Sequence, residues 1–500
     1  MTRHLQLAGL GLLCLLFLMA ARPSGTGAAV AGGGSYYVAT DGDDGSGNGS
    51  AASPWASITH ALDNVPDGST ILVRPGLYQG RIRIRGTFVQ GVTVRSEQPY
   101  EAVLENNDRV ITAYAHPGGV RGITIEGFEI RHAGPESAPL VIHIDGNGDG
   151  SVSHITLRDN ILHDSYDNDI LKINNAAHDV LVEGNMFYNQ SGSDEHIDIN
   201  GVENVIVQDN IFFNDFGGSG RINNNDTSSY IVIKDSNGQG DLYAGSRFVT
   251  VRRNVFLNWE GSTGSNFVLI GEDGQPFIEG RDILVENNLM LGNSGNVMRA
   301  AFGVKSGADI VFRNNTVVGD LPALAFAMRL NTETTAVSNQ NISFYNNIWS
   351  DPTGTMGAEN PTRPNDFSDT PIGQTSSFTL ETNLYWNGGA AVPEDPDELV
   401  NYTDDPNRIV ADPLLPSPTG IILPRWQGNG FAGGADTIRE AFVQVVGFGM
   451  PGPGAPVVDA ADPAQAPGED ILGNVRVVPD IGAAELFNAP YVVYLPVTQD

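Results

Sequence analysis

The sequence has almost no cysteine. Among its 500 residues the single cysteine, Cys14, lies in an apolar segment close to the N-terminus. A mature chain without that segment would contain no cysteine at all. This excludes disulfide bonds as a source of stability, so we expect a fold that is stabilised by packing of its interior.

Positive charge is also scarce. Lysine and arginine together number 27 against 59 acidic residues, for a formal net charge of −32. Such a negative field repels nucleic acid and anionic membranes, so neither is an expected partner. It favours solubility and the binding of cations. An anionic polysaccharide would need bound metal ions between itself and this protein.

Long hydrophobic runs are confined to the N-terminus. Arg3 and His4 precede an apolar run from Leu5 to Ala21, and Ala29–Ala31 offers small residues for cleavage. This order predicts a signal peptide over residues 1–31. We therefore expect a protein that a bacterium secretes or displays at its surface, with no membrane association after cleavage. A retained membrane anchor is the alternative.

What the chain does contain is a repeated sequence motif. Alternating apolar residues are followed by two polar residues, an asparagine and a further apolar residue. The asparagines recur at steps of 25, 25, 44, 34, 27 and 32 residues, and they are Asn160, Asn185, Asn210, Asn254, Asn288, Asn315 and Asn347. A repeat of this length predicts a solenoid, and a step of 25 residues is too short for a four-stranded propeller blade.

These repeats predict an all-β protein, a right-handed parallel β-helix. Each coil would stack its short strands about 4.8 Å from the coil before, with the apolar residues pointing inward. The asparagines would lie where the chain bends, bond to one another and adopt left-handed backbone angles. Residues 32–350 would form the β-helix with an N-terminal cap that contains a short helix, Ser57–Val65. Residues 351–487 would form irregular last coils and a C-terminal cap, and 488–500 a short tail.

Polar residues gather on three consecutive predicted strands. Each strand contains outward residues between inward Ile and Leu residues, and two of the three lysines of the chain are among them. Equivalent positions of neighbouring coils lie one strand spacing apart. We therefore expect one patch that consists of Asp169, Lys172, Asp194, Glu195, Asp198 and Lys234.

Clustered carboxylates suit a hard cation with oxygen ligands, above all Ca²⁺. The charged form of a lysine beside bound Ca²⁺ is disfavoured, so the lysine can act as a base. Removal of the C5 proton of a uronate sugar then permits β-elimination of the glycosidic oxygen. The expected partner is an acidic polysaccharide, and the expected state is a monomer.

The series Asp169, Asp194-Glu195, Asp198 and Lys234, with the entry segment Tyr36–Tyr78, resembles the family 9 polysaccharide lyases. These are Ca²⁺-dependent pectate lyases with a parallel β-helix fold. The resemblance implies that the four acids are calcium ligands and that Lys234 is the catalytic base. The second acid of the pair is Glu195 where the family has Asp, and the family's aromatic residue before the last Asp is replaced by Ile197.

Three further residues are candidates for substrate binding, and other interpretations stay open. Lys172 belongs to the patch, Arg221 and Arg247 lie in predicted loops near it, and all three could bind a sugar carboxylate. The patch could equally be a solvated acidic face, in which Lys172 and Asp198 form a weak ion pair, or could hold calcium for structure alone. A non-catalytic carbohydrate-binding or surface β-helix is therefore the alternative function. A hydrolase ranks lower because the polygalacturonase motifs are missing.

Overall fold

The computed structural model describes residues 33–486 except 115, 193, 222–226, 261–265, 293–297, 320–324, 334–336 and 358–365. All of these residues belong to one compact unit, Gly33–Asp500. The expected signal peptide and the tail 488–500 lie outside the described residues. Within the described part of the chain, no helix combines the length and the apolar character that crossing a membrane requires.

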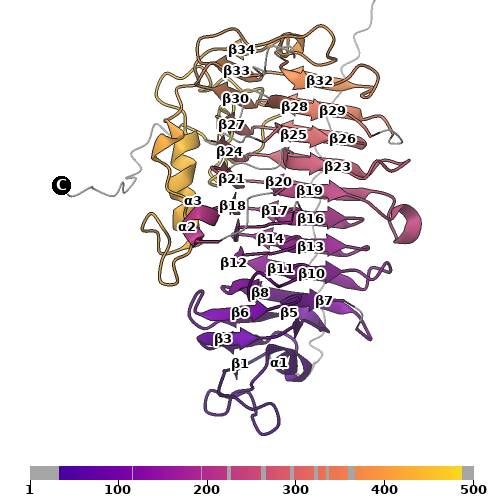
Figure 1. The fold of residues 1–500 in the computed structure, drawn as a ribbon, viewed down its shortest axis with the longest axis vertical. Coiled ribbons are helices and arrows are strands. Elements are labelled where there is room, and N and C mark those ends of the chain that lie inside the picture. Colours follow the sequence, from indigo (N-terminus) through magenta and orange to yellow (C-terminus); the bar gives the residue numbers. More distant parts are fainter. Residues whose placement is uncertain are drawn as a thin grey trace, which may run out of the picture. The chain divides into compact units, whose positions relative to one another are not determined.

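Three parallel sheets run the length of this unit, and the chain visits them in turn (Figure 1). Sheet 1 consists of β1 (Ser35–Val38), β2 (Thr70–Val73), β5 (Gly86–Ser96), β8 (Val120–Glu126), β11 (Val152–Arg158), β14 (His178–Glu183), β17 (Glu203–Gln208), β20 (Ser246–Arg252), β23 (Gly280–Glu286), β26 (Gly307–Arg313), β29 (Gln340–Tyr345) and β32 (Phe378–Glu381).

Sheets 2 and 3 complete each coil. Sheet 2 consists of β3 (Gly76–Gln79), β6 (Ala102–Asn106), β9 (Glu129–His132), β12 (Ile161–His163), β15 (Met186–Tyr188), β18 (Ile211–Phe213), β21 (Val255–Asn258), β24 (Leu289–Gly292), β27 (Thr316–Val318), β30 (Ile348–Asp351), β33 (Leu384–Asn387) and β34 (Ile409–Val410). Sheet 3 consists of β4 (Ile82–Arg83), β7 (Ile111–Ala113), β10 (Ile142–Asp145), β13 (Leu171–Asn174), β16 (Ile197–Asn200), β19 (Ile231–Lys234), β22 (Asn266–Ile270), β25 (Ala300–Val304), β28 (Phe326–Leu330) and β31 (Ser368–Asp369).

This arrangement is the predicted right-handed parallel β-helix. Strands of one sheet come from successive coils, and each pairs in register with the strand one coil earlier and one coil later. Inward side chains at equivalent positions stack into one continuous core. In sheet 1, for example, a fully buried row is formed by Ile123, Ile155, Val180, Val205 and Val249.

The asparagine repeat forms a buried ladder at the corner between sheets 1 and 2. Asn185 Nδ2 donates to Asn210 Oδ1 at 3.1 Å, and Asn210 Nδ2 donates to Asn254 Oδ1 at 3.0 Å. The same contact continues beyond the predicted end of the repeat, from Asn347 to Asn383 and finally to Asp405. Each amide also bonds to backbone groups, so the ladder satisfies polar groups that the bend would otherwise leave buried and unpaired.

One detail of the expected bend is wrong. The left-handed backbone falls on the residue before the ladder asparagine, as at Asp209 (φ 59°) and Arg253 (φ 52°), rather than on the asparagine itself. The asparagine keeps an ordinary backbone because its side chain has to point along the stack. The turn before it supplies the change of direction.

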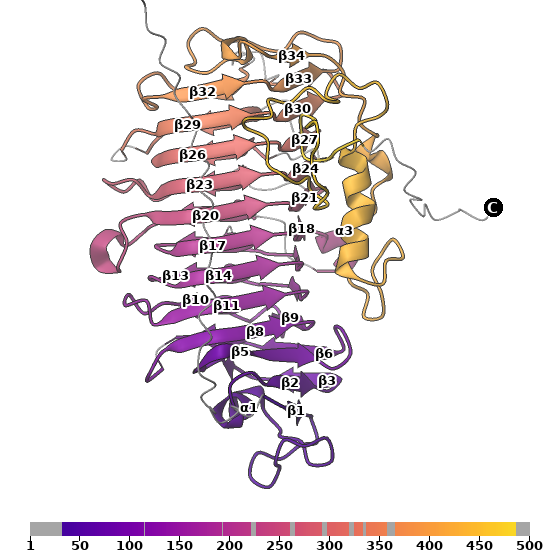
Figure 2. The ribbon, with the colours of Figure 1, turned by 180° about the vertical axis from the view of Figure 1, so that it is seen from behind.

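Two helical segments cover the β-helix. The predicted cap helix is present as α1 (Ile58–Asn64), with Ser57 as its N-cap. Helix α3 (Ile438–Val446) lies against sheet 2 (Figure 2), where Phe442 and Val446 join Phe213, Leu257 and other outward residues in a second apolar cluster. The short helix α2 (Phe216–Ser219) follows β18. The C-terminal region therefore shields an apolar sheet face from solvent.

The ladder predicts a large effect of one amide. Substitution Asn210→Ala removes the acceptor of the buried Asn185 backbone amide and the donor to the buried Val182 carbonyl. Each lost partner costs about 1–3 kcal/mol, so we expect the free energy of unfolding, measured in urea, to fall by roughly 2–6 kcal/mol. The control is Asn407→Ala at an exposed position, which should change stability by under about 0.5 kcal/mol. Equal effects of the two substitutions would contradict a stabilising role for the ladder.

Candidate functional site

Three acidic side chains converge on the outer side of sheet 3. Asp198 is the outward residue of β16 and pairs in register with Lys172 on β13. Asp169 and Glu195 lie just before these two strands, in equivalent places of consecutive coils. All three acids are buried, with exposed fractions of 1% for Asp169, 3% for Glu195 and 2% for Asp198. We call them the acid cluster.

The acid cluster has the size of a cation site. One carboxylate oxygen from each of its residues lies within 4.8 Å of the others. Two oxygens on one Ca²⁺ can be separated by no more than about 5 Å, twice the Ca–O distance, so the spacing fits. In addition, Asp198 Oδ1 is buried and has no hydrogen-bond partner among the described residues. The three carboxylates therefore fit a hard divalent ion.

Lys172 neutralises part of this charge. Its Nζ hydrogen-bonds to Asp198 Oδ2 and lies 3.5 Å from Asp169 Oδ2. Burial alone would lower the pKa of Lys172, but the two carboxylates raise it to about 12. Lys172 is thus held as a cation inside the cluster. Its ammonium group touches two of the predicted calcium ligands.

Lys234 interacts electrostatically with the acid cluster, but it lies on β19 two residues beyond the position that pairs with Asp198. In register it stands opposite Asn200, whereas Val232 stands opposite Asp198. Its Nζ donates to Glu272 Oε2 at 2.6 Å and lies 3.6 Å from Asp273 Oδ1. Burial would lower the pKa of Lys234, yet Asp198 and Glu272 raise it far above its usual value.

The acids themselves are held away from their ionised forms. Burial, with the Asp198 carboxylate next in importance, raises the pKa of Asp169 to about 7. Burial and Asp169 raise the pKa of Glu195 well above its ordinary value. Such shifts mark a place where a positive ion would relieve repulsion between carboxylates.

Asp194, the fourth predicted ligand, stands at the edge of the cluster. Its Oδ2 accepts a hydrogen bond from Asn168 Nδ2 at 3.0 Å. Burial raises the pKa of Asp194 to about 6. The nearby Lys172 ammonium lowers this pKa, and the Asp198 carboxylate raises it. Asp194 is therefore close to the acid cluster, although it is not one of the three residues whose oxygens share a common centre.

Sequence reasoning missed Glu272 and Asp273. They follow β22, one coil beyond Lys234, and lie outside the repeated asparagine motif. A usable signal did exist, because Gly271-Glu272-Asp273-Gly274 comes directly after an apolar strand, at the same end as the other acids. Loops after equivalent strands of a solenoid meet on one side of it.

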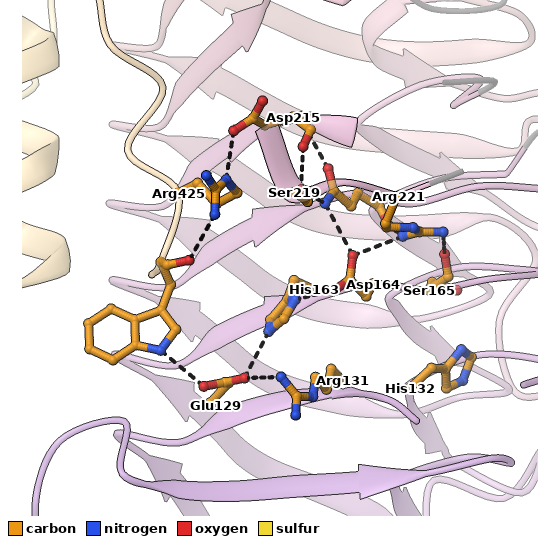
Figure 3. Close-up of polar contacts among 12 residues, drawn as sticks. Glu129, Arg131, His132, His163, Asp164, Ser165, Asp215, Ser219, Arg221 and Arg425 are labelled. Carbon is orange, nitrogen blue, oxygen red and sulfur yellow. Dashed lines mark hydrogen bonds and ion pairs between the residues drawn. The ribbon is translucent and has the colours of Figure 1, made fainter. Parts of the chain in front are cut away.

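Arg221 lies in a different polar network, which Figure 3 shows. Its guanidinium donates to Asp164 Oδ1 at 3.0 Å and to the Ser165 carbonyl at 3.0 Å, beyond the end of β12. His163 lies between Asp164 and Glu129, with contacts of 2.8 and 3.3 Å. The indole of Trp426, from the C-terminal region, donates to Glu129 at 3.0 Å. This network ties the C-terminal region to sheet 2.

Arg247 lies on sheet 1. It stands opposite Glu203 in register, 3.3 Å from that carboxylate, and its guanidinium lies over the ring of Tyr243 at 4.5 Å. The structure therefore brings Lys172 and Lys234 to the acids, whereas Arg221 and Arg247 have their contacts at sheets 2 and 1. A role of these arginines in binding substrate stays a prediction.

Comparisons with known proteins agree on the fold. No protein-family model matches the chain. The uncharacterized protein YwoF of Bacillus subtilis is 25% identical over 141 residues, which are 26% of this chain and 29% of that protein, so the match spans under a third of it. The lacto-N-biosidase of family GH136 from Eubacterium ramulus aligns with a TM-score of 0.50 and 13% identity, over 76% of this chain and 67% of that one.

Two lyases are also similar in structure. Pectate lyase Pel9A aligns over 91% of this chain and 97% of its own, at 14% identity and a TM-score of 0.45. An alginate lyase from Paenibacillus sp. aligns over 65% of this chain and 95% of its own, at 17% identity and a TM-score of 0.44. The likeness to the lacto-N-biosidase, at a TM-score of 0.50 and 13% identity, shows the β-helix fold alone.

The network in Figure 3 predicts a loss of stability in mild alkali. Burial would lower the pKa of His163, but Asp164 and Glu129 raise it from 6.5 to about 8. Its stabilising charge is therefore fully present below pH 6.5 and is lost as the pH rises through about 8. The loss is on the order of 1–2 kcal/mol.

We expect the free energy of unfolding, measured in urea at several pH values, to fall over that interval in the wild type. The fall should be about 1–2 kcal/mol smaller in His163→Gln, and the part that remains comes from buried acids such as Asp169, whose pKa is raised to about 7. The control is His154→Gln, at an exposed position, which should keep the wild-type slope. The same slope in wild type and His163→Gln would refute this origin.

Proposed function

We propose that this protein is a Ca²⁺-dependent lyase that cleaves a uronate-containing polysaccharide of the pectate type by β-elimination. The observation that carries the proposal is the acid cluster, three buried carboxylates with oxygens within 4.8 Å of one another, beside Lys234. The fold of the similar solved structures is compatible with it. With residues 1–31 as a signal peptide, the protein would act outside the cell.

Asp169, Glu195 and Asp198 would hold the ion, with Asp194 at the rim. A bound Ca²⁺ would supply positive charge that neutralises the sugar carboxylate and acidifies the proton at C5. The unpartnered Oδ1 of Asp198 is the ligand atom that needs no rearrangement. Lys172 would have to move away from Asp198 Oδ2 or share that carboxylate, because its Nζ already contacts it.

Lys234 would take the C5 proton. It can do so only when uncharged, and the carboxylates around it hold its pKa far above the ordinary value. Glu272, 2.6 Å from Nζ, is the group to which Lys234 can pass a proton. Positive charge at the acid cluster would remove part of the field that keeps Lys234 protonated. Substrate and cation together would thus prepare the base.

A non-catalytic carbohydrate-binding β-helix is the second candidate function. It is favoured by the pairing of both lysines, because Lys172 and Lys234 each contact two carboxylates. Such compensation stabilises a buried polar group whether or not any reaction occurs. The two candidates differ in turnover, which is directly measurable.

The first prediction of the lyase proposal concerns turnover. On polygalacturonate with Ca²⁺ we expect unsaturated products, detected by their ultraviolet absorbance. Lys234→Met should lower kcat at least about a hundredfold, because a general base contributes that much. The matched control is Lys305→Met, which removes the lysine next to β25 on the same sheet and its ion pair with Glu333 at 2.8 Å. It should keep most of the activity.

Two outcomes would decide against the lyase. One is that the wild type with Ca²⁺ releases no unsaturated product from a panel of uronate polymers. The other is that Lys234→Met retains full activity. Binding of such polymers without turnover, unchanged in Lys234→Met, would favour the second candidate.

The second prediction concerns the cation. Ca²⁺ should raise the melting temperature of the wild type, and the gain should grow between pH 5 and 8. Asp169, with a pKa of about 7, and Asp194, with a pKa of about 6, must lose their protons before they can bind a metal ion. Asp198→Asn should abolish the gain, whereas Asp149→Asn, at an exposed loop position, should preserve it. A gain that is independent of Asp198 would place the ion elsewhere.

A further inference from the structure

A pocket lies on sheet 2, on a different sheet from the acid cluster. Its floor is a row of three outward residues, Val318 on β27, Ser350 on β30 and Trp386 on β33, which pair in register across consecutive coils. These three strands are neighbours in sheet 2 (Figure 1). Their inward neighbours Trp349 and Tyr385 belong to the core. The alternation of the strands therefore fixes Ser350 and Trp386 side by side on the outer face.

The C-terminal region forms the walls of the pocket. Residues 412–418 run past the floor and contribute Asp412, Leu415, Ser417 and prolines, and the volume is about 370 Å³. This lies within the range of about 300–1,000 Å³ that small-molecule sites occupy. The prolines restrict the backbone of this wall, so the pocket is largely formed before any ligand arrives.

Three residues of the pocket have hydrogen-bonding groups without a partner in the described part of the chain. The indole Nε1 of Trp386, the Oγ of Ser350 and the Oδ2 of Asp412 make no hydrogen bond to the described residues. Asp412 uses only Oδ1, which accepts from the Leu414 amide at 2.9 Å. Trp386 is partly exposed, although it also packs against an apolar cluster. Trp386, Ser350 and Asp412, each with a polar atom that makes no hydrogen bond to the described residues, thus line the same space.

The lining excludes several classes of ligand. No lysine, arginine or histidine lines the pocket, and Asp412 adds a negative charge, so phosphates and uronates are disfavoured. Quaternary ammonium groups are recognised by cages of several aromatic rings, whereas this pocket has a single one. What fits is a neutral ring with an apolar face for Trp386 and hydroxyl groups for Ser350 and Asp412.

We propose that this pocket binds a neutral pyranose unit of a carbohydrate, with the sugar ring stacked on Trp386 and its hydroxyl groups bound by Asp412 and Ser350. The site is distinct from the acid cluster in place and in chemistry, since it takes an uncharged sugar. It would anchor the protein to neutral chains of an extracellular matrix. It does not depend on the lyase proposal, because binding here requires neither Ca²⁺ nor Lys234.

The test is affinity electrophoresis of the full-length protein in native gels that contain xylan, glucomannan, galactan or β-glucan. At least one neutral polymer should retard the wild type without Ca²⁺. Trp386→Ala should raise the apparent dissociation constant at least tenfold, and Trp386→Phe should retain part of the binding. Asp412→Ala, at an exposed position, should weaken binding severalfold.

Two control variants show whether the retardation arises in this pocket. Leu414→Ala changes an exposed apolar residue of the same segment outside the pocket and should bind as the wild type does. Lys234→Met should also bind normally, so failure of the lyase proposal leaves this result unaffected. The proposal is overturned if no neutral polymer retards the protein, or if Trp386→Ala and Asp412→Ala both bind like the wild type. Competition by choline or by a proline-rich peptide instead of neutral oligosaccharides would equally overturn it.

Discussion

Register between coils is the constraint on which the rest of this structure depends, and the buried asparagine ladder enforces it. An amide that accepts from the coil before and donates to the coil after can do so at only one alignment of the strands. A slip of one residue would turn every inward side chain outward and would break the ladder at the same time. With no disulfide available, the register is fixed by the amide ladder together with the inward apolar side chains, and not by covalent cross-links.

The acid cluster is a direct product of that register. Asp198 lies beside Lys172 because their strands pair residue by residue, and Asp169 and Glu195 follow from the same alignment. Burying three carboxylates together is unfavourable unless positive charge compensates them. Two of the three lysines of the chain lie there, but one oxygen of Asp198 still has no hydrogen-bond partner among the described residues. Compensation of the negative charge is therefore incomplete. The burial of all three acids distinguishes this cluster from a solvated acidic face.

Much of this could be predicted from the sequence, because a solenoid converts spacing along the chain into neighbourhood in space. The ladder asparagines, the cap helix at Ser57 and the meeting of Asp169, Glu195 and Asp198 followed from periodicity alone. What could not be predicted came from loops of unequal length. Glu272 reaches Lys234 from a loop outside the repeat. Arg221 follows α2, and its neighbours Asp164 and Ser165 belong to a coil turn outside the repeated asparagine motif.

The ladder also gives the molecule a chemical direction. Every asparagine passes an N–H toward the C-terminal end, and Asp405 receives the last one. A carboxylate only accepts hydrogen bonds, so Asp405 cannot donate one to a following coil. Its oxygens are already occupied by the Thr382 and Asn383 amides. The residue that ends the ladder therefore provides no donor through which the ladder could continue into a second molecule stacked on this end.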